Sequence, residues 1–80
     1  MMHEHVVEVV YPERFKRLCE RMMARLDIYT SREIGFVVRL SRDYMRLGWF
    51  LTRDQQTWFE SLCRKGNMKK PLMVDHGDDV

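Results

Sequence analysis

The residues best suited to chemistry in this chain are arginines that recur at helical spacing. They form two stripes of four, Arg14, Arg17, Arg21 and Arg25, then Arg32, Arg39, Arg42 and Arg46. A guanidinium offers planar donors that match phosphate or carboxylate, and arginines along one helix face can contact successive phosphates. The stripes therefore indicate a nucleic-acid-binding surface. Its predicted residues are Arg14, Arg17, Arg21, Arg25 and Arg32.

A solvated, ion-paired helix face is the alternative interpretation of the same pattern. Glu13 lies four residues before Arg17, a spacing that allows an ion pair on a helix. Arg21 and Arg25 are instead a like-charged pair at the same spacing, which costs a few tenths of a kcal/mol. Net charge is only +2 over 80 residues, so overall charge does not decide between the two interpretations.

Large apolar residues in a predicted turn provide a second candidate surface. Trp49, Phe50 and Leu51 follow Gly48, and they either fold back over the core or stay exposed as an anchor for a protein partner. Such an anchor would be oriented by the arginines of the preceding helix. The predicted partner-binding residues are Arg39, Arg42, Arg46, Trp49 and Phe50.

Catalytic and cofactor patterns are missing from the sequence. The glycines are isolated, and no Ser/His/Asp, Cys/His or paired-carboxylate arrangement has a useful spacing. Met1, Met2 and His3 with a free amino terminus have the nitrogen ligands of a square-planar Cu(II) or Ni(II) site, but no second ligand cluster accompanies them. We therefore predict a protein that is not an enzyme and that has no cofactor and no functional metal site.

Cysteine usage and hydropathy bear on the compartment. Cys19 and Cys63 lie on predicted apolar stripes without a CxxC partner, which is typical of buried, reduced thiols in a cytosolic protein. No apolar run approaches the roughly 18 residues that a membrane span needs. The sequence predicts a cytoplasmic protein without a membrane partner.

Capping patterns define the helices that would position these residues. Two capping boxes are present, Thr30 with Glu33 and Thr52 with Gln55. Pro12 suits the first position of an earlier helix, and Gly66 ends the last one. The predicted helices span residues 12–27, 31–47 and 53–65.

The amino-terminal segment 5–10 is rich in valine and favours a strand. Its partner would be the apolar run 72–74 or a second copy of the chain, whereas a short extra helix is the competing interpretation. The predicted fold class is mainly α, a small three-helix domain with a short terminal β-strand pair. Residues 1–66 form the single helical domain, and residues 67–80 form a partly ordered tail.

The segment 36–65 resembles a two-helix segment found in small proteins encoded by bacteriophages and mobile elements. The shared pattern is a helix ending in R-x-G, then L-T-x-x-Q-x-x-W and a leucine. Here it is formed by Arg46, Gly48, Leu51, Thr52, Gln55, Trp58 and Leu62. The resemblance implies a phage or mobile-element protein, a source of dedicated inhibitors of host defence, anti-CRISPR proteins among them.

These observations lead to two functional hypotheses. The first is a non-enzymatic inhibitor that occludes a site on a host protein or nucleoprotein complex, such as a CRISPR-Cas complex. The second is a nucleic-acid-binding accessory protein that uses its arginine-rich helix faces. Self-association as a homodimer, through the valine-rich segment or through Met22 and Met23, is a further hypothesis about partners.

Overall fold

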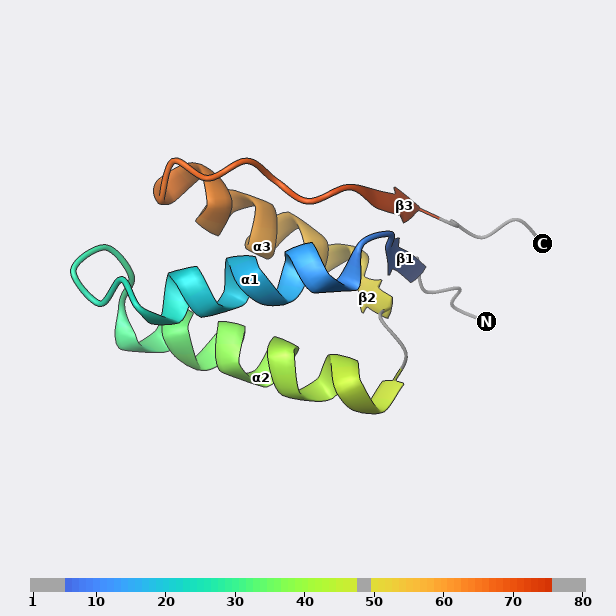
Figure 1. The fold of residues 1–80 in the computed structure, drawn as a ribbon, viewed down its shortest axis with the longest axis horizontal. Coiled ribbons are helices and arrows are strands. Elements are labelled where there is room, and N and C mark those ends of the chain that lie inside the picture. Colours follow the sequence, from blue (N-terminus) through green and yellow to red (C-terminus); the bar gives the residue numbers. More distant parts are fainter. Residues whose placement is uncertain (1–5, 48–49, 76–80) are drawn as a thin grey trace.

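The computed structural model describes the backbone of residues 6–47 and 50–75 and the side chains of residues 6–42 and 50–75. The elements are β1 (Val6–Val9), α1 (Pro12–Met23), α2 (Ser31–Leu47), β2 (Phe50–Thr52), α3 (Arg53–Lys65) and β3 (Met73–Asp75). In Figure 1, α1 lies between α2 and α3, and the strands gather at the end where α1 and α3 begin. The described part is thus a three-helix domain with a small sheet at one end.

Reciprocal hydrogen bonds start α2 and α3 where the sequence predicts. The Thr30 amide donates to Glu33 Oε1 at 2.8 Å, and the Glu33 amide donates to Thr30 Oγ1 at 3.2 Å. At α3, the Thr52 amide donates to Gln55 Oε1 at 2.9 Å, and the Gln55 amide donates to Thr52 Oγ1 at 3.1 Å. The predicted spans 31–47 and 53–65 are therefore confirmed.

Helix α1 is shorter than predicted, because it ends at Met23 and not at Asp27. After Met23 the chain forms turns, in which the amides of Ile28 and Tyr29 both donate to the carbonyl of Arg25. This path carries Tyr29 into the core, where its hydroxyl donates to the carbonyl of Leu62 at 2.8 Å. A hydrogen bond to a residue in another helix thus outweighs the helical periodicity that continues past Met23 in the sequence.

The strand interpretation of segment 5–10 and its pairing with the run 72–74 are confirmed, since β1 pairs antiparallel with β3. The sheet is larger than the predicted strand pair, however, because it has three strands in the order β2-β1-β3. Phe50 and Leu51 lie in β2, not in a turn. The physical reason is burial: Leu51 pairs with Val7, and both side chains enter the core.

The carboxy-terminal segment supplies one edge of this sheet. Residues 68–72 run back beside α3 from its end to β3, as Figure 1 shows. Val10 donates its amide to the carbonyl of Leu72 at 3.2 Å, which holds the segment next to the start of α1. Part of the predicted tail is therefore ordered against the helices.

The core joins all three helices, the sheet and the loop before α2. Its members are Val7, Val9, Phe15, Leu18, Cys19, Met22, Tyr29, Val37, Leu40, Leu51, Phe59, Leu62 and Cys63. Between α1 and α3, the rings of Phe15 and Phe59 have centroids 4.6 Å apart. Leu26, which lies within the predicted helix 12–27, is 72% exposed because α1 has already ended.

Candidate nucleic-acid interface

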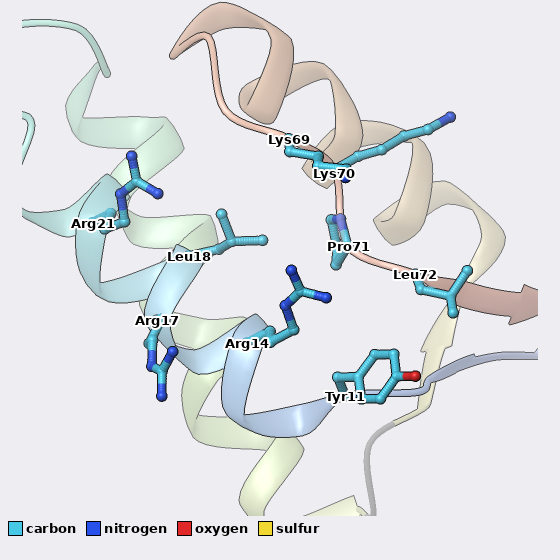
Figure 2. A pocket seen from close by; sticks show the side chains of 9 residues that line it. All are labelled: Tyr11, Arg14, Arg17, Leu18, Arg21, Lys69, Lys70, Pro71 and Leu72. Atoms are coloured by element: carbon cyan, nitrogen blue, oxygen red, sulfur yellow. The ribbon is translucent and has the colours of Figure 1, made fainter.

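A groove of about 640 Å³ lies between α1 and the segment that leads to β3, as Figure 2 shows. It is lined by Tyr11, Arg14, Arg17, Leu18, Arg21, Lys69, Lys70, Pro71 and Leu72. Five of these residues are cations and none is an acid, so the groove concentrates positive charge. The remaining four provide apolar and aromatic surface.

The amphipathic pattern of α1 positions one wall of the groove. Phe15, Cys19 and Met22 turn into the core, which leaves the arginines on the outer flank of the helix. In Figure 2, Arg14 extends from α1 towards Pro71. Arg14 and Arg21 are seven residues apart, which corresponds to about 10 Å along a helix. This wall thus carries separated positive charges.

The opposite wall depends on how the chain leaves α3. Gly66 is the C-cap of α3, and the following residue Asn67 has φ of 55°, a left-handed conformation that asparagine tolerates. The Met68 amide then donates to the carbonyl of Cys63 at 2.8 Å, which turns the chain back along the helix. Residues 69–72 consequently run opposite α1 and form a second wall, which includes Lys69 and Lys70.

The groove cations make no ion pair within the residues that the structure describes. Ion pairs among described side chains occur elsewhere, such as Lys65 with Glu33 at 2.7 Å. The pairing of Glu13 with Arg17 that the sequence allows is not among them. Arg14 instead lies over the Tyr11 ring, with 5.8 Å between Cζ and the ring centroid. An incoming anion would therefore not need to displace a carboxylate.

Two of the five predicted nucleic-acid-binding arginines lie outside the groove. The Arg25 guanidinium donates to Asp27 from Nε at 3.1 Å and from Nη2 at 3.2 Å. This hydrogen bonding lowers the pKa of the Asp27 carboxyl. Arg25 leaves the stripe because α1 ends before it, and exposed Arg32 belongs to the start of α2. The groove retains Arg14, Arg17 and Arg21 from the predicted set.

Lys69 and Lys70, in the second wall of the groove, are not among the residues predicted from sequence. The sequence does carry a signal for them, because the run 72–74 is a predicted partner for the amino-terminal strand. A strand pairing there requires the preceding residues to pass close to the start of α1. The two lysines could therefore have been placed beside the arginine stripe.

The predicted protein-binding residues are distributed over α2 and the sheet. Arg39 and Arg42 are exposed on α2, and Phe50 is 45% exposed on β2. The side chain of Arg46 and the whole of Trp49 lie outside the described residues. None of the residues that the structure describes in this set lines the groove.

Both cysteines are buried in the core and free of disulfides. Burial raises the pKa of the Cys19 thiol to about 12 and that of the Cys63 thiol to about 11. These thiols stay protonated near neutral pH, which makes them poor nucleophiles and poor metal ligands.

The described ranges 6–47 and 50–75 contain no group of three or more His, Cys, Asp or Glu side chains that could hold a metal ion. Met1, Met2 and His3 lie outside these ranges. Among the helices in the described part of the chain, none is both long and apolar enough to cross a membrane.

Comparisons with protein-family models, with curated proteins and with solved structures gave no match for this chain.

Proposed function

We propose that this chain is a non-enzymatic nucleic-acid-binding protein whose basic groove holds the phosphates of its ligand. The observation that carries the proposal is that Arg14, Arg17 and Arg21 line the same groove as Lys69 and Lys70, with no acidic residue in its lining. Cations from two separate segments that line one groove form a more localised field than a stripe on one helix face. Arginine forks bind phosphate groups through paired hydrogen bonds, and lysine ammonium groups bind them as point charges.

The mode of binding follows from the charge of the groove. Each phosphate neutralised by a groove cation releases condensed counterions, so affinity should fall as salt rises. The contacts with phosphate carry no sequence information, and the proposed binding is therefore tolerant of base sequence.

Fluorescence anisotropy of a labelled oligonucleotide tests the proposal with matched arginine variants. Arg14→Gln with Arg21→Gln removes two groove cations, whereas Arg25→Gln removes a cation that is paired with Asp27 outside the groove. The groove double variant should bind at least about tenfold more weakly at low salt, given the steep dependence of affinity on phosphate contacts. Arg25→Gln should bind nearly as the wild type does. If Arg25→Gln loses about half as much binding free energy as the double variant, as net charge alone predicts for one cation against two, a localised site would be contradicted.

The outer face of the sheet supports a second candidate, the inhibitor that occludes a host nucleoprotein complex. Glu8 pairs with Phe50 on one side and with Val74 on the other, which places these three residues in one row across the sheet. Phe50 and Val74 are each 45% exposed, and nearby Val6 is 38% exposed. Exposed apolar residues grouped on one face favour a protein partner.

An inhibition assay tests this second candidate. Target-DNA binding by purified CRISPR effector complexes would be measured with and without the chain. If the sheet face is the contact, wild-type chain should reduce target binding and Phe50→Ser should lose at least about tenfold in potency, as expected for an aromatic anchor. Leu72→Ser, which alters an exposed apolar residue of the groove, is the control and should retain potency. Unimpaired target binding at excess wild-type chain would remove CRISPR inhibition as a function.

A further inference from the structure

One end of the basic groove is apolar and exposed, which phosphate binding alone does not explain. Tyr11 is 50% exposed and Leu72 is 58% exposed, although both lie beside a packed core. The hydrogen bond from the Val10 amide to the Leu72 carbonyl holds the backbone at this end. Figure 2 shows Tyr11 and Leu72 at the same end of the groove, with Arg21 farther along α1. The ligand of this groove should therefore carry a flat apolar group as well as anionic groups.

The order of side chains along α1 sets the spacing between these groups. Tyr11 is followed by Arg14, Arg17, Leu18 and Arg21, so that the α1 wall offers an aromatic ring and an apolar side chain among its cations. A nucleic-acid strand likewise carries planar bases next to phosphates. Arg14 lies over the Tyr11 ring. A base stacked against Tyr11 would therefore be adjacent to a guanidinium that can donate hydrogen bonds to a phosphate.

The size of the groove favours a single strand over a duplex. The space between its two walls is about 640 Å³, which is within the roughly 300–1,000 Å³ typical of sites that bind small molecules. A base that has left its stack can enter a space of this size, whereas the bases of a duplex are stacked inside the helix. A duplex could contact the groove cations, but its paired bases would offer no free face to the Tyr11 ring.

On the basis of the proposed function, we infer that the groove selects single-stranded nucleic acid and stacks one base on Tyr11. Arg14 and Arg21 hold phosphates of the same strand, while Leu18 and Pro71 provide the apolar floor between them. Lys69 and Lys70 add sequence-independent attraction from the opposite wall. Tyr11 is thus the residue that makes binding selective for a single strand, whereas the cations attract any polyanion.

Anisotropy titrations with three probes of equal length test this inference: a labelled oligothymidylate, the same backbone with abasic sites, and a duplex. Wild-type protein should prefer the oligothymidylate to both other probes. Tyr11→Leu should weaken binding of the oligothymidylate by about 5- to 150-fold, the range for loss of one stacked base, and should leave the abasic probe nearly unchanged. Tyr11→Phe keeps the ring and should retain the preference. Phe50→Leu changes an exposed aromatic outside the groove and serves as the matched control.

The outcomes separate this inference from the proposed function. If the abasic probe or the duplex binds as tightly as the oligothymidylate, or if Tyr11→Leu has no effect, base stacking is excluded, even when Arg14→Gln still weakens every probe. If none of the probes binds at low salt, both the inference and the proposed function fail. An acidic peptide of equal charge that displaces the oligothymidylate at the same concentration would also overturn selection for a nucleic-acid strand. Circular dichroism establishes that each variant is folded.

Discussion

At Gly66 the lack of a side chain lets the Tyr29 phenol reach the end of α3. The Tyr29 hydroxyl donates to the Leu62 carbonyl at 2.8 Å, and a Cβ on Gly66 would overlap that hydroxyl. Gly66 has φ of −90°, which any residue can adopt, so the requirement for glycine here is one of space and not of backbone conformation. This contact links the loop before α2 to the helix from which the groove segment departs.

We expect Gly66→Ala to destabilise the fold by roughly 1–3 kcal/mol, because the added methyl group must displace a buried aromatic side chain and its hydrogen bond. Gly35→Ala is the matched control, since a Cβ there meets nothing within 4 Å. Gly35 lies inside α2, where alanine is favoured over glycine by about 0.5–1 kcal/mol. Urea unfolding followed by circular dichroism should therefore show opposite shifts in the two variants. A shift of the same sign in both would refute the close-approach explanation.

At the scale of elements, the start of α3 also ends a strand. Thr52 is the last residue of β2, where it pairs with Val6, and it is the N-cap of α3. Its hydroxyl accepts the Gln55 amide at 3.1 Å, and this bond satisfies a donor that the helix leaves free. One side chain thus fixes the junction between the sheet and the third helix.

Loss of this cap should have a measurable cost. Thr52→Ala should lower the free energy of unfolding by about 1 kcal/mol, the typical effect of removing an N-cap hydroxyl. Thr57→Ala removes a hydroxyl that only donates to the Arg53 carbonyl within α3, at 3.0 Å, and should change stability by less than about 0.5 kcal/mol. Chemical denaturation of both variants measures the difference. Equal stability of the two variants would show that the capping box contributes little to folding.

The features that could be predicted from sequence are those set by neighbours along the chain. The hydroxyl of Thr30 and the carboxylate of Glu33 are three residues apart, so their reciprocal bonds follow from local geometry. The early end of α1 could not be predicted from neighbouring residues, because it depends on the hydrogen bond from Tyr29 to Leu62 in another helix. The two walls of the groove differ in the same way. The position of Arg14 on its wall follows from helical spacing, whereas the position of Lys69 depends on the pairing of β1 with β3.

The exposed aromatic residues show a similar limit. Phe50 and Leu51 are adjacent in sequence and have the same apolar character, yet Phe50 is 45% exposed and Leu51 is 3% exposed. Their difference arises because alternate residues of a strand point to opposite faces, and β2 exists only through its pairing with β1. Sequence identified Phe50 as a candidate contact but could not specify which face would present it.

At the scale of the whole molecule, the fold brings both ends of the described chain to the groove. β1 leads into Tyr11 and α1, while the segment after α3 returns to pair with β1 through β3 (Figure 1). Arg53 and Asp75 form an ion pair that connects the start of α3 with β3. The sheet therefore sets the separation of the two groove walls.

The measurement that tests this account most directly is the salt dependence of wild-type affinity for a labelled single strand. If three to five groove cations neutralise phosphates, the logarithm of the binding constant should fall against the logarithm of salt concentration with a slope between about −2 and −3.5, at roughly 0.7 per phosphate. Arg14→Gln should make that slope shallower by about 0.7. Absence of binding at low salt, or a slope near zero, would contradict a phosphate-binding groove.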